Sequence, residues 1–114
     1  MTPAQALKTI PKKIKVGPHV YGVCVVDRIP GDDPEDRAFI DTDKQIILIV
    51  KDHASSAQVV GCAIHELLHA IWIDRDLGKR AEEERAVLNF ESGLVQLFQD
   101  NPKLLTWIQK GLKQ

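Results

Sequence analysis

The segment from Ser55 to Asp76 constrains the fold of this chain more than any other, because it predicts one long apolar helix. The segment holds no proline, and its apolar residues recur at spacings of three and four, as on one broad face of a helix. These residues are Val59, Val60, Ala63, Ile64, Leu67, Leu68, Ile71 and Trp72. A helix with such a face must be covered by the rest of the chain, so the segment predicts the central helix of a folded domain.

The same segment contains the five residues HELLH, with His65 and His69 four positions apart and Glu66 directly after the first histidine. Residues four apart lie on one face of a helix, so both imidazoles can reach one metal ion while Glu66 lies beside a metal-bound water. The alternative is a buried helix whose two histidines are satisfied by hydrogen bonds. For Glu66, the alternative role is a salt bridge to Arg75 or Lys79.

Two histidines need a third protein ligand, and a catalytic zinc site leaves its fourth position to water. Glu82, Glu83 and Glu84 follow His69 by 13 to 15 residues and fall in the first turn of a helix predicted from about Arg80 to Asp100. One of them can return toward the metal across the turn at Gly78. The alternative is that an acidic first turn only complements the helix dipole.

The remaining segments predict a sheet before the helices, within one domain that spans residues 1–114. The first dozen residues indicate a short helix or arm, and residues 14–27 a strand region with bends at Gly17-Pro18 and Gly22. Ala38 to Asp41 and Gln45 to Val50 predict a hairpin, and the apolar run of the second segment predicts burial on both faces or cover by the next helix. A last short helix follows Asn101-Pro102. The expected fold class is α+β, with about three strands in a small twisted sheet.

Composition excludes several classes of function. The formal charge of -1, without a basic stripe, disfavours nucleic-acid binding. No apolar run reaches the roughly 20 residues that span a bilayer, and the N-terminus lacks a secretory signal, so we expect a soluble cytoplasmic protein. Cys24 and Cys62 form no CxxC pair and are predicted to be small buried residues, with a thiolate ligand at Cys62 as the alternative. The acidic run at 29–37 indicates a solvated loop rather than a calcium site.

The order of hairpin, HELLHA helix, short turn and glutamate-bearing helix resembles the gluzincin metallopeptidases. The resemblance is strongest to their minimal ImmA/IrrE-like members and to compact metallopeptidase-like proteins often encoded in phages and prophages. It covers about half of the chain, from Ala38 to Leu97. In that family the ligand glutamate is followed by a small or branched residue three positions later and by apolar residues six and ten positions later. Glu84 fits with Val87, Phe90 and Leu94, whereas Glu83 fits only the first requirement and is held in reserve.

The resemblance implies a zinc-dependent endopeptidase, with zinc held by His65, His69 and Glu84 and with Glu66 as general base. It also implies a protein or peptide substrate lying along a sheet edge, for which Gln45 to Val50 is the candidate. The alternatives are a zinc-binding interaction module without turnover and a metal-free adaptor. The chain departs from the family at the fourth position after the ligand glutamate, where Leu88 replaces Asn or Asp, so no partner for a metal ligand is expected there.

Other polar and aromatic residues have weaker claims to function. His53 precedes the HELLH helix and is a better candidate for a proton carrier or ligand than His19. Trp72 and Trp107 are predicted to anchor the core rather than to stack on a substrate. Asp74 can orient a histidine or can be a surface acid of the helix.

Overall fold

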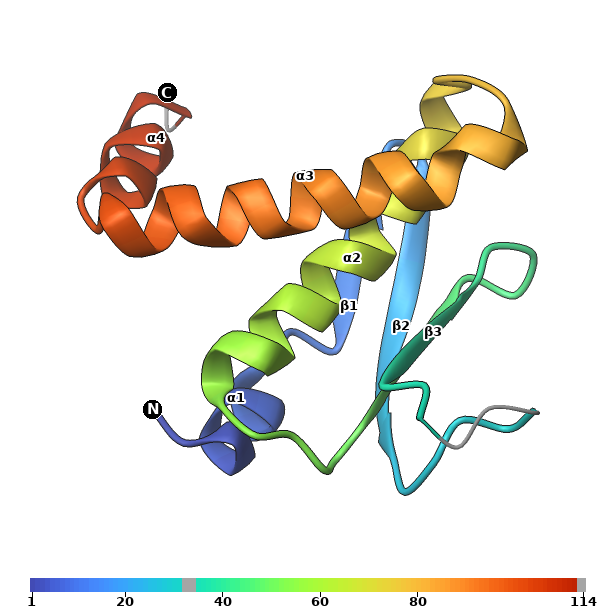
Figure 1. The fold of residues 1–114 in the computed structure, drawn as a ribbon, viewed down its shortest axis with the longest axis horizontal. Helices are drawn as coiled ribbons and strands as arrows, with labels where there is room; N and C mark the ends of the chain where they lie inside the picture. The colour runs from blue at the N-terminus through green and yellow to red at the C-terminus, as the bar shows by residue number, and fades with distance from the viewer. Residues whose placement is uncertain (32–34, 113–114) are drawn as a thin grey trace.

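A computed structural model describes residues 1–31 and 35–112, and it has the predicted α+β class. Within these residues, four strands form one mixed sheet, and four helices accompany it (Figure 1). The elements are α1 (Pro3–Thr9), β1 (Lys13–Val16), β2 (His19–Val26), β3 (Ala38–Asp41), β4 (Ile46–Val50), α2 (Ser56–Arg75), α3 (Arg80–Asp100) and α4 (Leu104–Leu112). The predicted acidic loop at 29–37 lies partly outside the described residues.

The sheet has the strand order β1-β2-β4-β3. β1 and β2 form an antiparallel hairpin, as do β3 and β4, and the two hairpins join through parallel pairing of β2 with β4. The predicted strand region at 14–27 is therefore two strands rather than one, because the chain reverses at Gly17-Pro18. Gln45 belongs to the second turn, since its φ of 56° takes it out of the extended region.

The core lies between the sheet and α2, which packs across one face of the sheet and contacts β1, β3 and β4. Ile47 and Ile49 of the central strand β4 point into this core and are almost completely buried. The prediction that the following helix covers this apolar run is confirmed. Cys24 is exposed, contrary to prediction, because its side chain lies on the strand face opposite to that of buried Val23.

Both ends of α2 have identifiable caps. Ser55 is the N-cap, and its hydroxyl accepts a hydrogen bond from the backbone N–H of Gln58. The helix ends at Arg75, two residues before the predicted Leu77-Gly78 stop, because Asp76 takes the left-handed conformation with φ 50°. By length and composition alone α2 could cross a membrane, but here it is the central helix of the fold.

α3 crosses the outer side of α2, so the molecule has three layers: sheet, α2 and α3 (Figure 1). Val87 of α3 is fully buried in this contact layer. The C-terminal half of α3 extends past α2, and α4 follows it after a short turn. Trp107 on α4 is 72% exposed, so the prediction that it anchors the core is wrong, whereas Trp72 is half-buried and donates its indole N–H to the carbonyl of Gly78.

The turn between β1 and β2 gives a test of the fold. Gly17 has φ +57°, and a Cβ there would lie 2.3 Å from the carboxylate of Asp74 on α2. We expect Gly17→Ala to lower the free energy of unfolding by about 1–3 kcal/mol through backbone strain and this collision. Gly22→Ala is the matched control, since a Cβ at Gly22 meets nothing within 4 Å. Equal urea midpoints for the two variants would contradict this account of the turn.

Candidate metal centre

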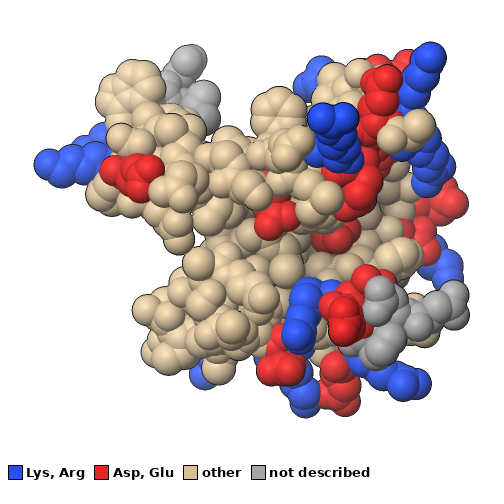
Figure 2. All heavy atoms as spheres, in the orientation of Figure 1, with Lys and Arg blue, Asp and Glu red and all other residues tan. Residues whose placement is uncertain are grey.

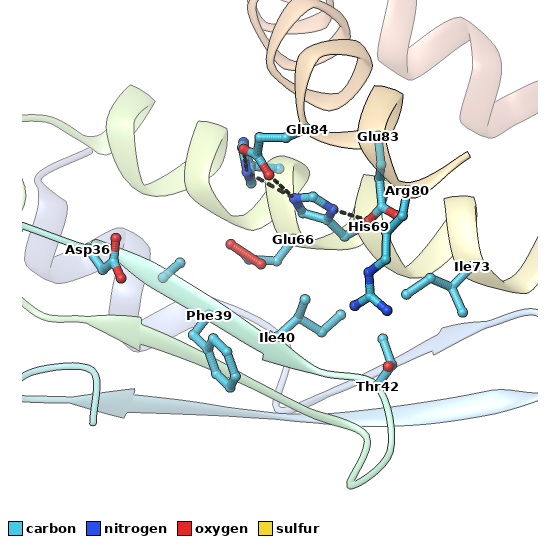
Figure 3. A pocket seen from close by; sticks show the side chains of 12 residues that line it. Asp36, Phe39, Ile40, Thr42, Glu66, His69, Ile73, Arg80, Glu83 and Glu84 are labelled. Atoms are coloured by element: carbon cyan, nitrogen blue, oxygen red, sulfur yellow. Dashed lines mark hydrogen bonds and ion pairs between the residues drawn. The ribbon is translucent and has the colours of Figure 1, made fainter. Parts of the chain in front are cut away.

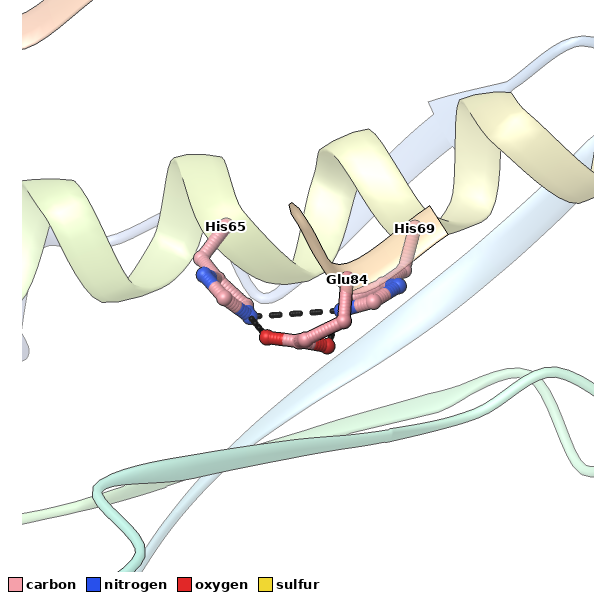
Figure 4. A group of neighbouring side chains, drawn as sticks. All are labelled: His65, His69 and Glu84. Carbon is pink, nitrogen blue, oxygen red and sulfur yellow. Dashed lines mark hydrogen bonds and ion pairs between the residues drawn. The ribbon is translucent and has the colours of Figure 1, made fainter. Parts of the chain in front are cut away.

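Three side chains from two helices converge on one point. His65 and His69 project from the same face of α2, and Glu84 reaches them from the second turn of α3 (Figure 4). The Nε2 atoms of the two histidines lie 3.2 Å apart. The carboxylate of Glu84 spans both, with Oε1 3.0 Å from Nε2 of His65 and Oε2 2.9 Å from Nε2 of His69.

The opposite nitrogen of each imidazole contacts another glutamate of α3. Nδ1 of His65 lies 2.7 Å from Oε1 of Glu91, and Nδ1 of His69 lies 2.5 Å from Oε2 of Glu83. A carboxylate can only accept, so in both pairs the imidazole donates its Nδ1–H. An imidazole that donates Nδ1–H to a carboxylate can present the lone pair of its Nε2 to a metal ion, and both Nε2 atoms face the carboxylate of Glu84.

A divalent cation fits this donor set. Nε2 of His65, Nε2 of His69 and the two oxygens of Glu84 are all electron-pair donors, and their mutual approach is unfavourable unless positive charge lies among them. Zinc–nitrogen bonds of about 2.0–2.1 Å at a tetrahedral angle place two ligand atoms about 3.3 Å apart, close to the observed nitrogen separation. Two imidazoles and one carboxylate are the ligand set of many catalytic zinc sites.

Glu66 lies beside this group, on the wall of the same cleft. It is only 7% exposed, and within the part of the chain that the structure describes its carboxylate has no hydrogen bond or ion pair. The alternative salt bridge to Arg75 does not form, because Arg75 contacts Asp74 instead. Burial raises the pKa of the Glu66 carboxyl, while the charges of His65 and His69 oppose that rise.

The histidines therefore have partners that the sequence analysis did not expect. Leu88, where a family with a similar HELLH motif has Asn or Asp, is half exposed, and its apolar side chain cannot accept a hydrogen bond. Glu91 takes that role for His65 because it lies seven residues, or two helical turns, after Glu84 and so shares its helix face. Glu83 does more than complement the helix dipole, since it is buried against His69. The seven-residue spacing between Glu84 and Glu91 was the feature of the sequence that could have predicted this contact.

A cleft of about 520 Å³ opens beside the centre, within the range of known ligand pockets. Its helical walls bear the metal-binding group, and its opposite wall is β3 with the residues that flank it (Figure 3). The strand contributes Ala38, Phe39 and Ile40. Figure 2 shows acidic side chains gathered along the N-terminal half of α3 and below it, whereas the surface toward α4 carries few charges.

The other predicted candidates lie away from the centre. Nδ1 of His53 contacts Oε1 of Gln58, its Nε2 is buried without a partner among the described residues, and the cleft does not include it. His19 contacts the side chain of Gln45. Asp74 packs near Gly17 and orients neither metal-site histidine.

Cys62 lies one helical turn before His65 but does not belong to the convergent ligand group of the described chain. Burial raises the pKa of its thiol, and the nearby charge of Glu91 raises it further. Both effects favour the neutral thiol over the thiolate that binds metal. The structure therefore favours the small half-buried residue over the auxiliary ligand at this position.

Comparison of the chain with protein-family models, with curated proteins and with solved structures gave no match.

The geometry predicts a graded effect of the glutamates on metal binding. Glu84→Ala should remove most of the bound zinc, because it removes the third ligand. Glu83→Ala and Glu91→Ala should each weaken zinc binding by about 10- to 100-fold, since the histidines lose the groups that orient them. Glu83→Gln should recover part of the loss, because its amide oxygen still accepts from Nδ1 of His69.

Competition with a chromophoric chelator would measure these zinc affinities, and exposed Glu82→Ala is the matched control. Equal affinities for the Glu82, Glu83 and Glu91 variants would show that neither carboxylate–imidazole contact supports the metal site.

Proposed function

We propose that this protein is a zinc-dependent metallopeptidase of the gluzincin type, with His65, His69 and Glu84 as metal ligands. One observation carries the proposal. Three ligand side chains converge in a cleft, and beside them lies the nearly buried carboxylate of Glu66, which has no hydrogen bond or ion pair among the described residues. A metal site of purely structural function is closed by four protein ligands, whereas this group of three leaves a position for water.

The protein's own groups have separate tasks in this proposal. Bound zinc would supply Lewis acidity and would lower the pKa of a water molecule. Glu66 accepts the proton of the attacking water and returns it to the leaving amine, for which it needs only hydrogen-bond reach. Glu83 and Glu91 hold the two imidazoles with Nε2 toward the metal position. The walls of the cleft limit the access of bulk water to Glu66, which is 7% exposed.

The strand that would receive a peptide is β3 rather than β4. The prediction that Gln45 to Val50 forms the edge is wrong, because β4 pairs with β2 on one side and β3 on the other. β3 has one free edge and lines the cleft. The backbone N–H of Val50 bonds to the carbonyl of Arg37, so by the alternation of an antiparallel ladder the backbone groups of Ala38 and Ile40 point to the free edge.

Two other functions remain as alternatives. A zinc-binding interaction module would use the metal to fasten α2 to α3, and a metal-free adaptor would use neither zinc nor Glu66. Neither alternative gives a role to the Glu66 carboxylate, which lies nearly buried in the wall of the cleft without a hydrogen bond or ion pair among the described residues, a placement that costs stability.

Replacement of the proposed base separates turnover from metal binding. We expect Glu66→Gln to retain one zinc per chain and to reduce hydrolysis of an unfolded protein substrate by about 10²- to 10⁴-fold. Metal content by mass spectrometry and release of fluorescent peptides would measure the two quantities, with Glu82→Gln as control. A zinc-loaded native protein with no hydrolysis would favour the interaction module, and a native protein that binds no zinc would favour the adaptor.

Proline substitution at the two edges of the sheet tests where the peptide binds. Ile40→Pro removes an outward-facing N–H from β3 without removing a bond of the ladder, so we expect peptide cleavage to fall while zinc content stays unchanged. Lys15→Pro removes the equivalent outward N–H from β1 at the opposite edge, and it should leave cleavage unaffected. Equal activity of the two variants would place the peptide elsewhere.

A further inference from the structure

The two ends of the cleft carry opposite charges. At one end the guanidinium of Arg80 points into the cleft beside Thr42 and Ile73 (Figure 3). At the other end lies the carboxylate of Asp36, with Glu66 and the metal-binding group between the two. Asp36 and Thr42 flank β3, so the strand that would pair with a peptide runs from the acidic end to the basic end.

The charges at the two ends of the cleft, those of Arg80 and Asp36, are available to a ligand. Within residues 1–31 and 35–112, neither Arg80 nor Asp36 forms an ion pair or hydrogen bond. The neighbouring charges are already paired. Arg37 contacts the side chain and the carbonyl of Asp52, while Glu83, Glu84 and Glu91 contact the two histidines.

The distance along β3 between the two ends of the cleft sets the length of peptide that can contact both charges. Asp36 and Thr42 are six residues apart and flank the four-residue strand β3, so they lie at most about 20 Å from each other. An extended peptide that pairs with β3 would therefore place residues six positions apart opposite the two ends. Such residues also point to the same side, because strand side chains alternate with a period of two.

We propose that the cleft selects peptides of defined charge polarity, with an acidic side chain toward Arg80 and a basic side chain toward Asp36. This inference rests on the proposed peptide-binding function and names its substrate class. The apolar side chains of Ile40 and Ile73 line the cleft and would contact the uncharged residues of the peptide (Figure 3). Charge complementarity of this kind discriminates between partners through attraction at one polarity and repulsion at the other.

The test uses two fluorescent nine-residue peptides with the same apolar centre. One carries Glu near its amino end and Lys six positions later, and the other carries the two charges exchanged. Binding is measured by anisotropy on zinc-loaded Glu66→Gln, so the result does not depend on turnover. We expect one peptide to bind roughly three- to tenfold more tightly than the other, the size of effect expected from exposed charges. Which peptide it is reports the direction of the bound chain.

A double charge reversal shows whether the two named residues are responsible. Arg80→Glu with Asp36→Lys leaves the net charge unchanged and should reverse the order of the two affinities. The control is Lys79→Glu with Glu82→Lys, which makes the same exchange on exposed residues outside the cleft and should preserve the order.

Equal affinities for the two peptides, or an order that survives the reversal, would overturn the inference. Failure of the proposed function has a different signature, in which the native protein cleaves neither peptide although the two still bind with unequal affinity.

Discussion

The packing of α3 across α2 is the contact on which the candidate centre depends. Val87 is fully buried in this layer, and Gly61 lets the helices approach so closely that a Cβ there would lie 3.1 Å from the carboxylate of Glu91. α2 alone would present two histidines without a third ligand. Because α3 supplies the carboxylates that contact both ring nitrogens of each imidazole, a small shift between the helices would change all four of these contacts together.

This arrangement concentrates negative charge, so its stability would depend on whether a cation is bound. Glu66 and Glu83 are nearly buried and Glu84 lies beside them, so without positive charge the carboxylates repel one another and lose hydration. A divalent cation would offset that cost and would fasten α2 to α3. The same groups that would weaken the metal-free protein would therefore favour a cation at this position, and the Glu66 carboxylate has no hydrogen bond or ion pair among the described residues.

The order of the strands decides which edge faces the centre. Parallel pairing of β2 with β4 places β4 in the middle of the sheet and leaves β3 beside the cleft. The apolar run of β4 was compatible with a central strand, yet its position before α2 suggested an edge. The local sequence pattern could not show whether β4 is a central or an edge strand. Parallel pairing of β2 with β4 joins residues more than twenty positions apart in the chain, and its backbone hydrogen bonds do not depend on the identity of the side chains.

The sequence by itself determined the elements and the chemistry they carry: the long apolar helix, its HELLH residues, the hairpin at residues 38–50, and an acidic first turn of α3. Helical and strand periodicities encode these features locally. Tertiary structure alone decided that Glu84 meets both Nε2 atoms, that Glu83 and Glu91 contact the two Nδ1 atoms, and that β3 is the edge strand beside the cleft. Each of these depends on how far α3 slides and rotates over α2 or on which strands pair, and such long-range packing leaves no periodic signal in the chain.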